Sequence, residues 1–166
     1  MEQMTEADLI HLAGVFDAIG VITVSVSKKD SYKVGYEITP IVRITSSRNT
    51  NRVLMGKIME YCDQRGVRYG ITEKENATDA KSDKIEIKRT ESIKRFLKPI
   101  LPSLVAKFKE ATIMLEEIIP RIEDDKHRSK EGVYELMEFA DMIRGTNKRG
   151  PTLKYDQTYF EEEWNL

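Results

Sequence analysis

The chain has 166 residues, 40% of them hydrophobic and 33% charged, which suits one domain with a full core. Its 27 Lys and Arg against 28 Asp and Glu give a net charge of -1, which excludes a uniformly basic nucleic-acid coat. The sequence contains no run of about 18 apolar residues, so it predicts no membrane span. The single cysteine, Cys62, cannot form an internal disulfide, and the first residues lack a signal-peptide pattern. We therefore expect an intracellular protein, in the cytoplasm or an organelle.

Charge is unevenly distributed along the chain. Residues 1–19 carry four acids and no Lys or Arg, residues 20–90 carry 14 bases against 9 acids, and residues 91–166 carry 13 bases against 15 acids. The basic middle favours a surface that faces a polyanion, although ordinary variation along a sequence also produces excesses of this size.

The first part of the sequence predicts a helix followed by a hairpin. Thr5 and Asp8 have the spacing of a capping box, and the apolar residues that follow predict a helix ending at Gly20. Apolar and polar residues then alternate over 22–27 and again over 37–45. This pattern predicts two strands, each with one buried and one polar face, that pair as an antiparallel hairpin.

The middle of the sequence repeats this order. Asn49 or Thr50 can cap a helix that continues to about Gln64 and stops at Gly66. Alternation over 67–72 and 84–88 then predicts a second hairpin.

Beyond Thr90 the pattern is helical. We expect a short helix over 92–97, a break at Pro99 and Pro102, a helix over 105–119 that Pro120 ends, and a last helix over 131–144. The sequence thus predicts an α+β fold, with a four-stranded antiparallel sheet backed by helices. We expect one domain over 1–145 and a polar, partly ordered tail over 146–166.

One short motif stands at the end of the first helix. Residues 12–20 read LAGVFDAIG, which resembles the LAGLIDADG motif of homing endonucleases at six of nine positions. The predicted order of elements is similar to that family's αββαββα core. Residues 101–147, with Pro102, Lys107 and Lys109, look like the extra C-terminal helices of the single-motif, homodimeric members. The resemblance implies that the sheets of two chains form one saddle-shaped surface.

The motif also suggests how two chains pair. Small residues at Ala13, Gly14 and Ala18 allow the backbone of a second helix to approach closely. The resemblance implies a homodimer about a two-fold axis, with its interface at Leu12, Ala13, Gly14, Asp17 and Ala18. The alternative is that these small residues only ease packing within the chain.

In the family, the polar face of the sheet lies in the major groove of double-stranded DNA. The resemblance therefore implies DNA contacts by Thr23, Ser25, Ser27, Lys29, Glu37, Thr39, Ile41, Arg43, Arg68, Gly70, Thr72, Glu86 and Lys88. These chemistries suit base recognition, because Arg and Lys can bind guanine, hydroxyls either kind of base, and Ile41 a thymine methyl group. Lys28, Tyr32, Lys33, Ser47 and Arg48 would instead bind phosphates. The alternative is a solvated strand face that binds nothing.

The match fails at the catalytic position. Members of the family carry, at the eighth place of the motif, an acid that binds the Mg²⁺ ions used in phosphodiester hydrolysis. This chain has Ile19 there, followed after Gly20 by apolar Val21. Because isoleucine cannot coordinate a hard cation, the family's metal site is not intact.

Other positions of the implied catalytic site are mixed. Ser46 occupies the place where related enzymes often carry a glutamine that orders solvent, and Lys107 matches a basic residue near the active site. Asp17 and Glu37 are the two acids that could replace the lost ligand. His11 and His127 are too far apart in sequence to suggest a metal site.

Three functional hypotheses follow. The first is a homodimer that binds a long, pseudo-palindromic DNA site in a sequence-specific manner, with cleavage lost or impaired by Ile19. The second is an active metal-dependent homing endonuclease that makes double-strand breaks. The third is an RNA-binding splicing cofactor or regulator on the same fold. Salt-sensitive, base-specific binding of duplex DNA distinguishes the first two from the third.

Overall fold

The computed structural model describes residues 3–75, 81–145 and 154–166, apart from the side chains of 48–51, 74, 75 and 81. Along the chain, the elements of the first half are α1 (Glu6–Ile19), β1 (Gly20–Lys28), β2 (Tyr36–Ser47), α2 (Arg48–Gln64), β3 (Gly70–Glu75) and β4 (Lys81–Ile87). The second half is helical and contains α3 (Thr90–Ile100), a 3₁₀ turn η1 (Leu101–Ser103), α4 (Phe108–Ile113) and a π-helical segment η2 (Met114–Ile118). It continues with α5 (Ile119–Glu123), a second 3₁₀ turn η3 (Lys126–Arg128), α6 (Lys130–Arg144) and α7 (Gln157–Trp164). The predicted α+β class is confirmed.

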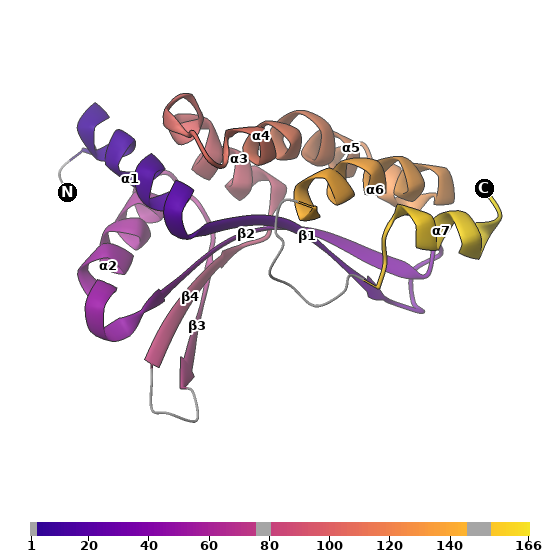
Figure 1. The fold of residues 1–166 in the computed structure, drawn as a ribbon, viewed down its shortest axis with the longest axis horizontal. Helices are drawn as coiled ribbons and strands as arrows, with labels where there is room; N and C mark the ends of the chain where they lie inside the picture. The colour runs from indigo at the N-terminus through magenta and orange to yellow at the C-terminus, as the bar shows by residue number, and fades with distance from the viewer. Residues whose placement is uncertain (1–2, 76–80, 146–153) are drawn as a thin grey trace.

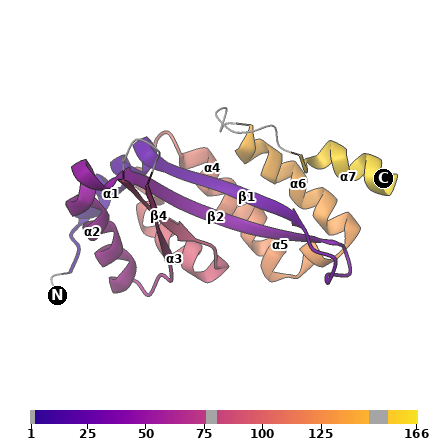
Figure 2. The same ribbon diagram turned by 90° about the horizontal axis from the view of Figure 1, so that it is seen from below.

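The four strands form one antiparallel sheet in the order β1-β2-β4-β3. Helices cover one face of it (Figure 1), and the view from below shows the strands in front of them (Figure 2). Within the described residues, no helix lies over the other face. Strand β2 pairs with β4 only from Val42 onward, so Pro40 lies where β2 has a neighbour on one side alone, which proline tolerates.

The hydrophobic core lies between the sheet and the helices. Alternate strand residues such as Ile22, Val42 and Ile85 point into it, and Phe16 of α1 meets Phe96 of α3 edge-on at 5.6 Å between ring centroids. The predicted capping box of α1 is confirmed, because the amide of Asp8 donates to Thr5 Oγ1 and the amide of Thr5 donates to Asp8 Oδ2. The predicted alternation of faces in the first hairpin is confirmed as well.

Four details of the predicted elements are wrong. Helix α2 begins at Arg48 with Ser47 as its N-cap, so Asn49 and Thr50 lie inside the helix and do not cap it. Strand β3 begins at Gly70 rather than 67, because Val67 is buried in the core and the amide of Arg68 donates to Ser92 Oγ. Helix α3 runs through Pro99 and ends one residue later. The backbone hydrogen bond that this proline cannot donate is therefore lost only in the last turn of the helix. Pro120 does not end its helix either. The π-helical segment directly before it widens the turn, and the amide of Ile119 reaches back to the carbonyl of Met114.

The C-terminal segment contains a helix that the sequence analysis did not predict. In α7, Phe160 is fully buried and its ring lies 4.9 Å from that of Tyr36 at the start of β2 and 4.7 Å from that of Trp164. The hydroxyls of Tyr36 and Tyr159 are 2.7 Å apart. These rings hold α7 against the end of the sheet where β2 begins. The boundary at residue 145 between a domain and a tail stays a prediction.

Candidate functional site

The motif ends where α1 passes directly into β1. Leu12, Ala13 and Phe16 point into the core, and Gly20 is the C-cap of α1. A Cβ on Gly20 would clash with the ring of Phe16 and lie 2.6 Å from its carbonyl oxygen, so the tight passage from helix to strand requires glycine. This passage sets Ile19 at the very end of α1, half-buried against the core.

Asp17 ties the end of α1 to the segment that carries Lys107. Its two carboxylate oxygens accept hydrogen bonds from the amides of Val105 and Lys107, both at 2.9 Å. Lys107 is the N-cap of α4, so one carboxylate joins elements about 90 residues apart. The structure therefore places the backbone of Lys107 beside the end of the motif, while a role of its side chain near an active site stays a prediction.

Ser46 lies on the other side of the sheet from the polar face. Along β2 it points to the same side as Val42 and Ile44, which belong to the core, and it is buried. Its Oγ has no hydrogen-bond partner within the described residues. The solvent-ordering role that the resemblance implies for Ser46 is thus not supported by its position.

The described residues do not fit a divalent cation at the end of the motif. Ile19 has no donor atom, and both oxygens of Asp17 already accept amide hydrogens. Glu37 pairs with Ser27, seven residues along β1 from Gly20, which places it about 23 Å away. Across the described part of the chain, no group of three His, Cys, Asp or Glu side chains could hold a metal ion.

The uncovered face of the sheet carries most of the residues that the sequence analysis assigned to DNA contacts. Strand register puts these residues on one face in facing pairs: Thr23 with Ile41, Ser25 with Thr39, Ser27 with Glu37, and Arg43 and Gly70 each with Glu86. Thr72 faces Lys84, a residue that the analysis missed although it has the same parity as Glu86. Ile41 is only 5% exposed, although it lies outside the main hydrophobic cluster, so it offers little surface for a thymine methyl group.

Arg68 and Lys88 lie just outside the strands. They line a recess of about 430 Å³ beside the second hairpin, together with Tyr69, Gly70, Thr72, Glu86 and Arg89. Both charged side chains are exposed. The recess therefore extends the polar face of the sheet with further positive charge.

Ion pairs cross this face. Glu86 accepts hydrogen bonds from Arg43 and pairs with Lys84. Glu37 pairs with Lys29 and accepts a hydrogen bond from the hydroxyl of Tyr32. Burial opposes the ionisation of Glu86, but the hydrogen bonds from the two cations outweigh it, so the pKa of this carboxyl lies below its usual value. The hydrogen bond from Lys29 lowers the pKa of Glu37 in the same way. Both acids are thus held as carboxylates.

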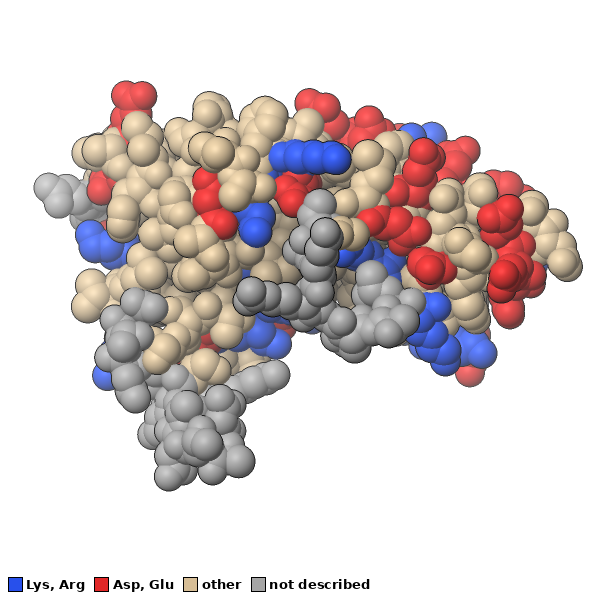
Figure 3. All heavy atoms as spheres, in the orientation of Figure 1, with Lys and Arg blue, Asp and Glu red and all other residues tan. Residues whose placement is uncertain are grey.

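The turn of the first hairpin carries the residues expected to bind phosphates. Lys28, Tyr32 and Lys33 are exposed, and Figure 3 shows Lys and Arg side chains gathered at this tip. Tyr32 and Lys33 also line a recess of about 400 Å³ with His127 and Arg128, which the sequence analysis did not connect with the hairpin. Ser47 is exposed at the N-cap of α2, and the side chain of Arg48 lies outside the described part of the structure.

The predicted interface residues of α1 divide into two groups. Leu12 and Ala13 are buried in the chain's own core, whereas Gly14 and Ala18 are exposed and Asp17 is half-buried. Three large apolar side chains are exposed on α1 or on the segment that Asp17 holds to it: Ile10 (54%), Val105 (84%) and Phe108 (47%). This side of the molecule is therefore apolar and open.

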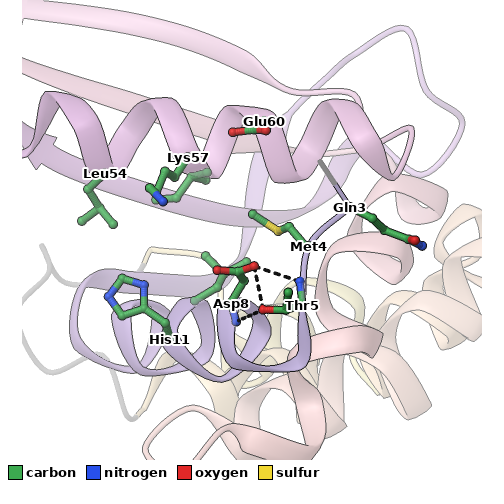
Figure 4. A pocket seen from close by; sticks show the side chains of 10 residues that line it. Gln3, Met4, Thr5, Asp8, His11, Leu54, Lys57 and Glu60 are labelled. Carbon is green, nitrogen blue, oxygen red and sulfur yellow. Dashed lines mark hydrogen bonds between the residues drawn. The ribbon is translucent and has the colours of Figure 1, made fainter. Parts of the chain in front are cut away.

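A cleft of about 360 Å³ separates α1 from α2. Asp8 and His11 line it from one side and Leu54 and Lys57 from the other (Figure 4). The hydrogen bonds from Thr5 are the main cause of the lowered pKa of Asp8. Asp8 is thus engaged in the capping box, and the cleft does not contain a catalytic arrangement.

Of the helices described, none is long and apolar enough to cross a membrane.

Solved structures of homing endonucleases share this fold. The archaeal intron-encoded homing endonuclease I-Vdi141I, complexed with DNA, has a TM-score of 0.77 and 19% identity over 97% of this chain and 98% of its own. I-CvuI, in complex with a DNA target and magnesium, has a TM-score of 0.76 and 18% identity over 95% and 92%. I-SmaMI, bound to an uncleaved target with calcium, has a TM-score of 0.72 and 16% identity, and this chain spans only 50% of its length.

No protein with a curated description matches the sequence. The family described as LAGLIDADG endonuclease, however, matches residues 12–112, which is more than half of the chain. The match begins at the first residue of the motif and includes the whole sheet and the segment tied to Asp17. The chain therefore belongs to the LAGLIDADG endonuclease family.

Proposed function

We propose that this protein is a homodimer that binds a long, pseudo-palindromic site in double-stranded DNA, and that its cleavage activity is lost or strongly impaired. The observation that carries the proposal is Ile19 at the end of an otherwise well-formed motif. The fold and the polar face of the sheet are present, while the metal-binding acid of the family is absent.

The uncovered face of the sheet supports DNA recognition. Hydroxyl, guanidinium and ammonium groups from β1, β2 and β4 lie there in register, which suits contacts to base edges in a major groove. Exposed cations at the hairpin tip and beside the second hairpin suit phosphates. Similar proteins such as I-Vdi141I and I-CvuI were solved with DNA.

The exposed side of α1 supports a homodimer. Gly14 and Ala18 leave open space for a second helix, and nothing lies within 4 Å of a Cβ built on Gly14. Val105 and Phe108 would add apolar contacts beside that helix pair. A dimer about a two-fold axis brings two sheets together and reads two half-sites.

The second hypothesis, an active nuclease, needs another metal ligand. Magnesium supplies Lewis-acid chemistry in this family, but Asp17 is occupied by backbone amides and Glu37 lies at the opposite end of the hairpin. These positions support loss of cleavage over replacement of the ligand. We place the protein in the cytoplasm or an organelle, where its DNA would be.

A binding selection tests this proposal. Randomised duplex DNA is incubated with the protein, bound duplexes are recovered and sequenced, and affinity is then measured against salt concentration with duplex RNA as competitor. We expect a two-fold symmetric consensus and an affinity that falls steeply with salt. Preferential binding of RNA, or no consensus, would contradict the proposal. Sedimentation of the protein and of Ala18→Arg should give a dimer and a monomer.

A further inference from the structure

Four residues form one row across the open face of the sheet. Val21 on β1 faces Arg43 on β2, Arg43 faces Glu86 on β4, and Glu86 faces Gly70 on β3. Val21 follows Gly20, so this row lies beside the end of α1. In the proposed dimer, this is the inner part of each half-site, close to the two-fold axis.

Within the row, Glu86 fixes the guanidinium of Arg43. Nε and Nη2 of Arg43 donate to Glu86 Oε2 at 3.0 and 2.9 Å. The other oxygen, Oε1, lies 3.1 Å from Lys84 Nζ. The side chain of Glu86 is only 15% exposed and its pKa is lowered, so it stays charged and in place at neutral pH.

This arrangement leaves the other edge of the guanidinium available. The hydrogen bonds of Arg43 in the described structure use Nε and Nη2, so both hydrogens of Nη1 and one of Nη2 remain free. Nη1 and Nη2 together form the fork that binds O6 and N7 of guanine in the major groove. On the other side of Glu86, Gly70 has no side chain, and a Cβ built there would meet nothing within 4 Å. A base pair can therefore approach the row closely.

We propose that Arg43 recognises a guanine in the inner part of each half-site and that Glu86, held in turn by Lys84, is the positioning residue that gives Arg43 its specificity. This inference rests on the proposed DNA-binding function and adds to it the identity of one base. Glu86 does not contact the base itself. Its contribution is to hold a long side chain in one orientation before DNA arrives.

Glu37 provides a matched control. It is also a carboxylate on the open face and is also paired with a cation, Lys29, at 3.1 Å. It lies six residues from Arg43 along β2, which is about 20 Å. Glu37→Gln therefore removes the same charge from the same face without affecting the row that contains Arg43.

The test is a selection from randomised duplex DNA with the unchanged protein, Glu86→Gln, Arg43→Lys and Glu37→Gln. We expect symmetric guanines at one inner position for the unchanged protein and for Glu37→Gln, whose own effect on base preference should be limited to the outer part of the half-site, where Glu37 lies. In Glu86→Gln and in Arg43→Lys, the preference for guanine at that position should fall about tenfold, while the preferences at other positions stay the same. Lysine lacks the fork of the guanidinium, and glutamine lacks the charge of the carboxylate that holds Arg43. Thermal unfolding of each variant verifies that it is folded.

The outcomes separate this inference from the function on which it rests. If the unchanged protein selects no consensus, the proposed function falls and the inference falls with it. If a consensus appears but lacks the inner guanine, or keeps it at full strength in Glu86→Gln or Arg43→Lys, the inference alone is wrong. A uniform loss of affinity in Glu86→Gln, with all base preferences unchanged, would also overturn it, since that result indicates a structural role only.

Discussion

Asp17 joins α1 to the segment before α4 through two hydrogen bonds. Asp17→Ala removes both acceptors for the amides of Val105 and Lys107. Hydrogen bonds to a charged group contribute about 1.5 to 3 kcal/mol each, but the bond to Val105 is exposed, and water can replace its acceptor. We therefore expect the free energy of unfolding to fall by about 2 to 3 kcal/mol in Asp17→Ala. Asp17→Asn, which keeps one acceptor oxygen, should lose about half as much.

Urea denaturation followed by circular dichroism measures these changes. It should be repeated at several protein concentrations, because a dimer couples unfolding to dissociation. Glu135→Ala on the exposed surface of α6 is the control and should change the free energy of unfolding by less than about 0.5 kcal/mol. If Asp17→Ala matched this control, the two hydrogen bonds would not hold the segment, and the position of Lys107 would need another explanation.

Three further predictions concern stability. Phe160→Ala should lower the free energy of unfolding by about 3 to 5 kcal/mol, because the ring is fully buried; a loss below about 1 kcal/mol would mean that α7 is not docked. Gly20→Ala should lower the free energy of unfolding by at least about 2 kcal/mol, because the added methyl group clashes with Phe16. Gly14→Ala is the control and should not destabilise the monomer. Equal losses in the two variants would contradict the role of Gly20 at the end of the helix. Burial lowers the pKa of His127 below its usual value of 6.5, so the unfolded chain binds the proton more tightly and stability should decrease as the pH falls below about 6.5. In His127→Gln this decrease should be smaller, and an unchanged pH profile would contradict it.

Local patterns predicted the part of the fold that local interactions determine. The capping box of Thr5 and Asp8 and the alternation along β1 and β2 each depend on residues a few positions apart. Alternation also assigned the open face correctly, since register fixes which residues share it. The same reasoning could have identified Lys84.

Features that depend on distant residues could not be predicted in this way. The spacing of Phe160 and Trp164 fits a helix, but the docking of this helix requires Tyr36, more than 100 residues earlier. The effect of Pro120 was misjudged because a π-helical turn before it accommodates the ring.

The candidate site was predicted in the same uneven manner. The motif located the end of α1 correctly, because its glycine is a property of the sequence itself, whereas the loss of the metal-binding acid at Ile19 stays a prediction. It did not indicate that Leu12 and Ala13 face inward, that Ser46 is buried, or that Asp17 accepts two amides from the segment of Lys107. Each of these depends on which elements pack together in three dimensions.

The central claim is that Ile19 separates binding from cleavage in this protein. The most direct measurement compares the unchanged protein with Ile19→Asp on the selected duplex, in Mg²⁺ or Mn²⁺, scoring bound and cut DNA in the same samples. We expect both proteins to bind the same site and only Ile19→Asp to cut it, in a metal-dependent manner. Metal-dependent cutting by the unchanged protein would contradict the account, because another ligand would then have to replace the acid.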